Sequence, residues 1–202
     1  MNRFALTVLA ATAAAGLLAG CDSKTPGTAT TAPGTGGNTG SPTSTSASSS
    51  GEAPPFTGTP LSLDAFKSDP CSLLKPEQIT QLGDMKPGKK DDRNGQPQCI
   101  WNPKAPTGAF SFTYTFSKNS LNDYYKNKSQ FPYFKPAQVS GYPAASFDGI
   151  DGVHGDCSTV VALSDKTALM VQVNMSTKTA PNYATPCAVS EKGAAIAIEG
   201  LK

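Results

Sequence analysis

The surroundings of Cys21 predict a specific chemical modification of its thiol. Positions 18–20 hold leucine, alanine and glycine, and this pattern resembles a bacterial lipobox. An apolar stretch over residues 4–18 follows the basic Arg3 and is too short to span a bilayer comfortably. We therefore expect a signal peptide over residues 1–20, cleavage before Cys21, and a diacylglyceryl group on its thiolate. That group would anchor the protein at the outer face of the plasma membrane.

The other four cysteines are Cys71, Cys99, Cys157 and Cys187. An even number in an exported chain predicts two disulfides, but four cysteines allow three connectivities. The strand predicted to end near residue 175 lies beside Cys157 in a hairpin, and the chain then leads on to Cys187. We therefore expect Cys157 to pair with Cys187 and, by elimination, Cys71 with Cys99.

His154 is the only histidine in the chain. A catalytic triad would need it together with Asp151 or Asp156, but the sequence has no Gly-x-Ser-x-Gly motif. Zinc sites draw on clusters of histidine and cysteine, and these cysteines are expected to be oxidised. Asp148, Asp151 and Asp156 lie in a glycine-rich stretch, but their spacing does not match a calcium-binding loop. We therefore expect no catalytic residue, metal or cofactor.

Residues 124–135 interleave five aromatic residues with three lysines. Aromatic faces stack on sugars and apolar groups, and lysines attract phosphate or carboxylate, so the segment suits a wall polymer or an envelope protein. Alternatively, the rings belong to the core and the lysines are solvated. Pro132 favours a loop, from which all the rings are hard to bury, so we expect one or two to face solvent. This aromatic–lysine surface consists of Tyr124, Tyr125, Lys128, Phe131, Tyr133, Phe134 and Lys135.

Composition divides the mature chain into a tether and a domain. Residues 22–55 are almost entirely Ser, Thr, Gly, Pro and Ala, which cannot bury enough apolar surface to fold. We expect a disordered tether over residues 21–59 and a single extracytoplasmic domain over residues 60–202. O-glycosylation of the tether is left open. The formal net charge of +2 argues against nucleic acid as a partner.

The domain is predicted to have an α+β fold, an antiparallel sheet packed by helices and stapled by two disulfides. Prolines suit the first turns of helices, and apolar residues alternate with Ser and Thr in the clearest early strand. In chain order, the predicted elements are helical segments at 69–74 and 75–83, a loop at 85–98, strands at 98–101 and 109–116, a helix capped by Ser120, short strands at 139 and 144–147, a hairpin of 157–163 with 167–175, and a helix at 186–201 weakened by Gly193.

Five motifs in order resemble the actinobacterial lipoproteins of domain-of-unknown-function family 3558. The resemblance covers residues 63–201 and implies export and lipid anchoring, but no established activity. One departure is Gly193, which stands where a good helix former is expected. The motifs are residues 69–77 around Cys71, Cys99-Ile100-Trp101, Gly141-Tyr142-Pro143-Ala144-Ala145, Asp156-Cys157 and Pro186-Cys187-Ala188.

The sequence favours a non-enzymatic module at the cell envelope that binds a ligand or a partner. A cell-wall enzyme or enzyme accessory is the alternative, against which stands the single histidine. A transporter's solute receptor usually has two lobes, for which the domain leaves little room. A deep pocket with convergent polar groups would favour a ligand receptor, and its absence would favour a partner-binding module.

Overall fold

A computed structural model describes residues 52–105, 108–175 and 177–202. The predicted signal peptide, Cys21 and the tether up to residue 51 lie outside the described residues. The last residues of the predicted tether contact the domain, because the Ala53 N–H donates to Asn122 Oδ1 at 3.3 Å and the rings of Phe56 and Tyr142 lie 6.0 Å apart. Contacts with the domain therefore begin before the predicted boundary at residue 60.

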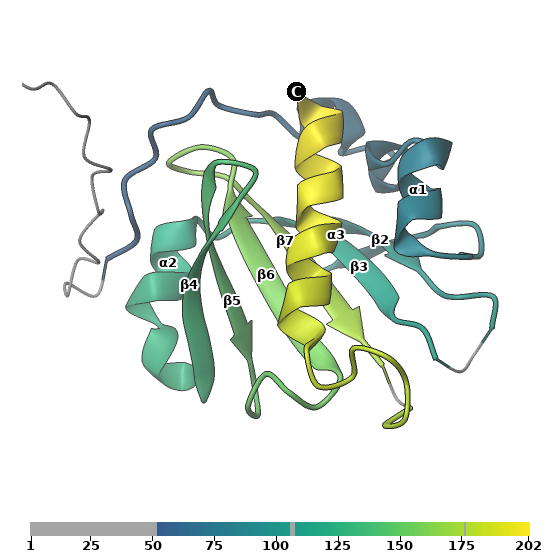
Figure 1. The fold of residues 1–202 in the computed structure, drawn as a ribbon. Helices are drawn as coiled ribbons and strands as arrows, with labels where there is room; N and C mark the ends of the chain where they lie inside the picture. Colours follow the sequence, from purple (N-terminus) through teal and green to yellow (C-terminus); the bar gives the residue numbers. More distant parts are fainter. Residues whose placement is uncertain (1–51, 106–107, 176) are drawn as a thin grey trace, which may run out of the picture. The chain divides into compact units, whose positions relative to one another are not determined.

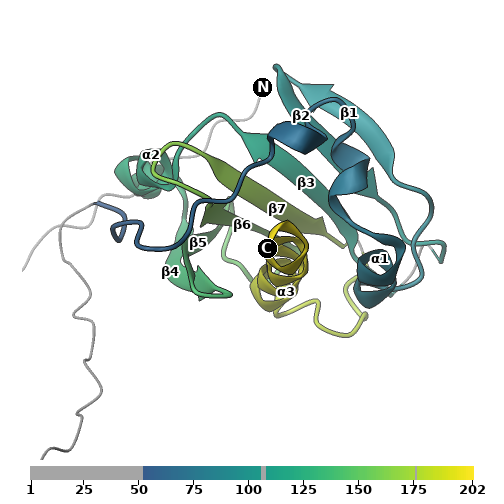
Figure 2. The same cartoon turned by 90° about the horizontal axis from the view of Figure 1, so that it is seen from above.

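Within the described residues, seven antiparallel strands form one sheet in the order β1-β2-β3-β7-β6-β5-β4 (Figures 1 and 2). The strands predicted for the late hairpin and near residue 112 are confirmed. The strands are β1 (Lys89–Arg93), β2 (Gln96–Trp101), β3 (Ser111–Ser117), β4 (Tyr133–Val139), β5 (Tyr142–Asp148), β6 (Asp156–Ala162) and β7 (Ala168–Asn174).

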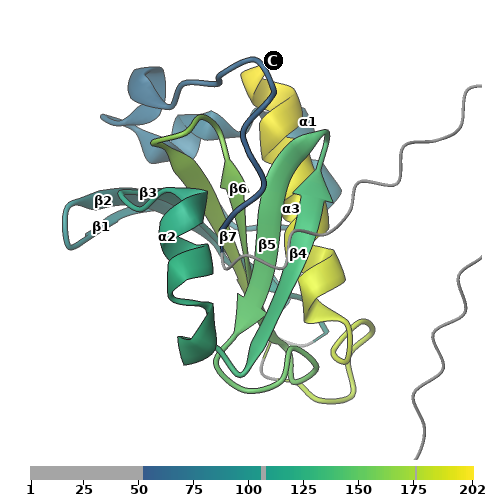
Figure 3. The same ribbon diagram turned by 90° about the vertical axis from the view of Figure 1, so that its left-hand side faces the viewer.

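Three α-helices occur in the described part of the chain: α1 (Pro76–Leu82), α2 (Leu121–Lys126) and α3 (Pro186–Leu201). Helix α3 lies across β6 and β7 on one face of the sheet, and α2 lies against the opposite face (Figures 2 and 3). The fold is therefore α+β, as expected, although the sheet dominates it. No described helix has the length and apolar character needed to cross a membrane.

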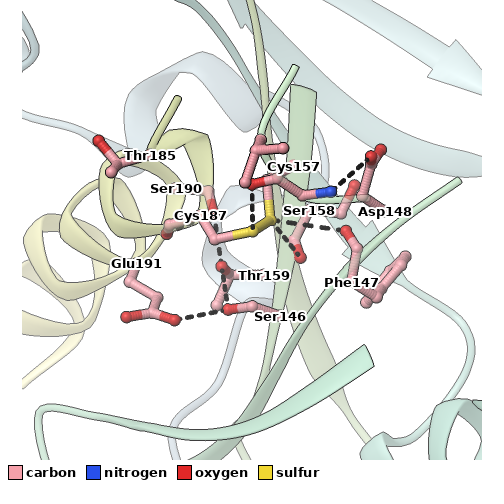
Figure 4. The surroundings of a disulfide bond; sticks show 12 residues. Ser146, Phe147, Asp148, Cys157, Ser158, Thr159, Thr185, Cys187, Ser190 and Glu191 are labelled. Carbon is pink, nitrogen blue, oxygen red and sulfur yellow. Dashed lines mark hydrogen bonds between the residues drawn. A yellow bond between two sulfur atoms is a disulfide. The ribbon is translucent and has the colours of Figure 1, made fainter. Parts of the chain in front are cut away.

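Both predicted disulfides are present, with a Cα–Cα distance of 5.0 Å in each. Cys71 lies in a 3₁₀ turn (Pro70–Leu73) that Asp69 caps, and its bond to Cys99 ties this turn to β2. Cys187, at the start of α3, bonds to Cys157 of β6 (Figure 4). The late hairpin predicts this pairing because β7 returns the chain to the beginning of β6.

The sheet separates two hydrophobic clusters, because successive side chains of a strand point to opposite faces. The larger cluster lies beneath α3 and includes Trp101, Tyr114 and Ile198. The smaller lies beneath α2 and includes Leu121 and Phe147. Burial of these two faces fixes the register of the strands.

Gly193 has a packing role, although glycine has a low helix propensity. The Tyr114 hydroxyl donates to the Gly193 carbonyl at 2.9 Å, and a Cβ at this position would lie 3.0 Å from the Phe112 ring. A glycine therefore lets α3 approach β3 closely. The departure from a good helix former is explained by this contact.

Strand β1 lies where a loop was predicted over residues 85–98. All five of its residues are exposed, so an edge strand of this kind carries no apolar alternation to detect. The missed signal is the turn: Asn94 and Gly95 have φ values of 57° and 70°, the left-handed pair that joins β1 to β2.

Strand β4, which was predicted only at Val139, corrects the expectation that the loop around Pro132 extends over Tyr133 and Phe134. Tyr133 and Phe134 begin a seven-residue strand paired with β5. The strand contains Pro136, which removes a backbone donor, but β4 lies at the edge of the sheet, where proline is tolerated.

Candidate ligand-binding cleft

The aromatic–lysine surface is divided between the two faces of the sheet. Tyr133 packs against the cluster beneath α3, whereas Phe134 packs against the cluster beneath α2 and lies 5.0 Å from the Tyr125 ring. Lys135 follows the alternation of β4 and shares the face of Tyr133. The seven predicted residues therefore do not form one continuous surface.

None of the five rings in this segment is fully exposed. Tyr125 is 5% exposed and the other four rings are half-buried, while Lys128 and Lys135 are exposed. The Tyr125 hydroxyl is buried and has no hydrogen-bond partner among the described residues. The Tyr124 hydroxyl lies 3.0 Å from Ser117 Oγ. Burial raises the pKa of both tyrosines. Four of the rings pack in the smaller cluster and Tyr133 packs against the larger one, and a binding role for the segment stays a prediction.

The aspartates near His154 hold the loop between β5 and β6. Asp148 Oδ2 accepts the backbone N–H groups of Ile150, Asp151 and Gly152, each at 3.1 Å. Asp151 Oδ1 lies 2.7 Å from His154 Nδ1, and this contact holds the pKa of the Asp151 carboxyl below its usual range. The described residues contain no cluster of metal-ligating side chains. Through the contacts above, Asp148 and Asp151 hold the loop together.

A cleft of about 540 Å³ opens at one end of the sheet. Its walls come from four segments that are distant in the sequence. They are the chain at residues 60–67, the turn between β1 and β2, the end of β3, and the turn between β6 and β7. The backbone bond from the Leu61 N–H to the Leu163 carbonyl, 2.9 Å long, holds the first segment against the end of β6.

The floor of the cleft is apolar and built from core residues. Leu61, Leu63 and Phe116 are each less than a tenth exposed, and Ala168 is fully buried. Phe116 is the last apolar residue of the alternating run in β3, and Ala168 begins β7 opposite the next residue, Ser117. The floor is therefore positioned by the sheet.

Three lysines line the rim of the cleft: Lys67, Lys118 and Lys166. Lys67 pairs with Asp64 at 2.6 Å, and the Lys118 ammonium donates to the Asn94 carbonyl at 2.8 Å. One aspartate against three lysines leaves a net charge of +2 on the lining. An apolar floor beneath a cationic rim can accept a molecule with an apolar body and an anionic group.

Among known families, one sequence model, described as "Protein of unknown function (DUF3558)", matches residues 16–199. Neither the curated proteins nor the solved structures contain a match to the chain. The matched region takes in all the strands and both disulfides. Because it covers most of the sequence, the chain belongs to the DUF3558 family.

Proposed function

We propose that the protein is an exported lipoprotein, anchored through Cys21 at the outer face of the plasma membrane, that binds a small ligand in its cleft. The lipobox and the signal peptide support the anchor. The two disulfides are consistent with export, because disulfides persist in oxidising compartments. In this proposal the domain is a non-enzymatic binding module of the cell envelope.

The cleft is the observation that carries the binding role. Its volume of about 540 Å³ falls within the range typical of small-molecule sites, and a mostly apolar lining with a few convergent polar groups is their usual character. The aromatic–lysine surface offers less support for a partner protein, because four of its rings pack in the smaller cluster and Tyr133 packs against the larger one. His154 lies outside the cleft lining.

Substitution of Ser62 tests the cleft. Ser62 is an exposed residue of the lining, so Ser62→Trp should fill the cleft without disturbing the core. The uncharged dye Nile red, which fluoresces strongly in apolar surroundings, should bind the wild-type chain and not this variant. Ser129→Trp, at an exposed serine outside the cleft, should bind as wild type does. Equal binding by all three proteins would rule out the cleft as the site.

Substitution of Cys21 tests the anchor. A Cys21→Ser chain has no thiol to accept the diacylglyceryl group, so it should accumulate without a lipid. Metabolic labelling with a fatty-acid analogue should mark the wild-type chain and leave the variant unlabelled. Equal labelling of the two chains would contradict the lipobox assignment.

A further inference from the structure

Lys118 is held at the rim of the cleft by the turn between β1 and β2. Its ammonium donates to the Asn94 carbonyl, and its backbone N–H donates to Gln96 Oε1 at 3.0 Å. A Cβ on Gly95 would lie 2.7 Å from the Lys118 Nζ, so a side chain at this position would displace the end of the lysine. Of the three ammonium N–H groups, two are left for a ligand.

The other two lysines of the rim differ in their pairing. Lys67 is largely neutralised by Asp64 at 2.6 Å. The Lys166 side chain is exposed and has no hydrogen bond or ion pair with any described residue. The excess positive charge of the rim therefore lies with Lys118 and Lys166.

We propose that the ligand of the cleft is a single-chain amphiphile with a phosphate monoester head group, an inference that rests on the proposed function. The phosphate accepts hydrogen bonds from Lys118 and Lys166, and the chain lies on the apolar floor. A phosphate monoester carries a charge of about −1.5 to −2 at pH 7, which balances the net +2 of the lining. A carboxylate would leave part of that charge uncompensated.

Displacement of Nile red compares the head groups on one chain length. The probes are dodecyl phosphate, dodecanoate and dodecanol, each below its aggregation concentration, added to the full chain carrying Cys21→Ser. Dodecyl phosphate should bind most tightly and dodecanol at least tenfold more weakly, since a charge-assisted hydrogen bond contributes about tenfold in affinity. The preference should shrink with added salt, because the rim is exposed.

Substitutions at the rim locate the head group. Lys118→Met and Lys166→Met keep an apolar stem. Each should lower the affinity for dodecyl phosphate about tenfold and leave the affinity for dodecanol unchanged. Asp64→Asn should raise the affinity for dodecyl phosphate, because it frees Lys67 from its partner. Lys126→Met, at an exposed lysine of α2 outside the cleft, is the matched control. Circular dichroism should show all the variants folded.

The outcomes separate this inference from the proposed function. The head-group assignment is overturned, and the binding role of the cleft is kept, in two cases. In the first, Nile red binds but dodecanol or dodecanoate binds as tightly as dodecyl phosphate. In the second, the Lys118 and Lys166 variants bind dodecyl phosphate as tightly as wild type does. If neither the dye nor any amphiphile binds the wild-type chain, the proposed function fails. Tighter phosphate binding that is lost in both lysine variants and kept in Lys126→Met supports the inference.

Discussion

Gly193 lies where α3 packs against the Phe112 and Tyr114 side chains of β3, and its replacement has two opposing effects on stability. Alanine should favour the helix by about 1 kcal/mol through its propensity. The added Cβ, however, would lie 3.0 Å from the Phe112 ring and 3.1 Å from the Tyr114 hydroxyl. Because overpacking typically costs about 1–3 kcal/mol, we expect Gly193→Ala to lower the free energy of unfolding, measured by urea denaturation.

Gly149 provides the control for this substitution. A Cβ there meets no atom within 4 Å, so Gly149→Ala should change the free energy of unfolding by less than about 0.5 kcal/mol. If Gly193→Ala instead stabilised the protein, the gain in helix propensity would exceed the cost of packing. The space between α3 and the side chains of β3 would then accommodate a Cβ.

At the scale of elements, the strands and helices that were predicted well from the sequence bury one face or both faces in the core. The alternation of β3, the β6–β7 hairpin and the helical spacing of α3 each reflect a face pressed against the core. The strands predicted least well are the two edges of the sheet: β1 was missed, and β4 was predicted only at Val139. Strand β1 buries nothing, and β4 contains Pro136, so neither shows the pattern of a central strand.

Helix α2 carries two neighbouring tyrosines, and removal of each hydroxyl should affect the free energy of unfolding differently. The Tyr125 hydroxyl is buried without a partner among the described residues, so Tyr125→Phe should leave the free energy of unfolding unchanged or raise it by up to about 1 kcal/mol. The Tyr124 hydroxyl contacts Ser117 Oγ, so Tyr124→Phe should lower it by about 1 kcal/mol.

Thermal and urea denaturation of the two variants, made singly, measure this contrast. Equal losses in both would show that the Tyr125 hydroxyl finds a partner in solution. Unchanged stability in both would show that α2 lies more loosely on the sheet than the ring contacts indicate. In either case the variants report on the core role of the aromatic–lysine surface.

At the scale of the whole molecule, the cleft shows what one sequence could not reveal. Its walls join residues from 60–67 to Ala168, and no local pattern marks residues so far apart as neighbours. The apolar members of its floor could be recognised individually as core residues. Their convergence with three lysines depends on the strand order, which brings β3 beside β7. Sequence reasoning directed attention to the aromatic–lysine surface because those residues are contiguous.

Burial of Tyr114 makes the stability of the whole domain sensitive to alkaline pH. Burial raises the pKa of Tyr114 well above its ordinary value, so the folded state keeps a proton that the unfolded chain releases near pH 10. The contribution is fully present below about pH 10 and is lost as pH rises, at about 1.4 kcal/mol per pH unit.

The Tyr114→Phe variant isolates this contribution. It should be less stable than wild type at pH 8, because the bond to the Gly193 carbonyl is lost, but its stability should fall less steeply between pH 10 and pH 11.5. Urea denaturation at a series of pH values gives both slopes. Parallel slopes would show that Tyr114 does not control the alkaline loss.

The two edge strands determine how copies of this domain behave when they are crowded together. Strand β1 presents five exposed residues, all charged, and β4 lacks a backbone donor at Pro136. Charge and proline at sheet edges discourage another chain from adding a strand. Where many copies met at high concentration, both borders of the sheet would resist edge-to-edge growth into fibres, and the domains would remain separate particles.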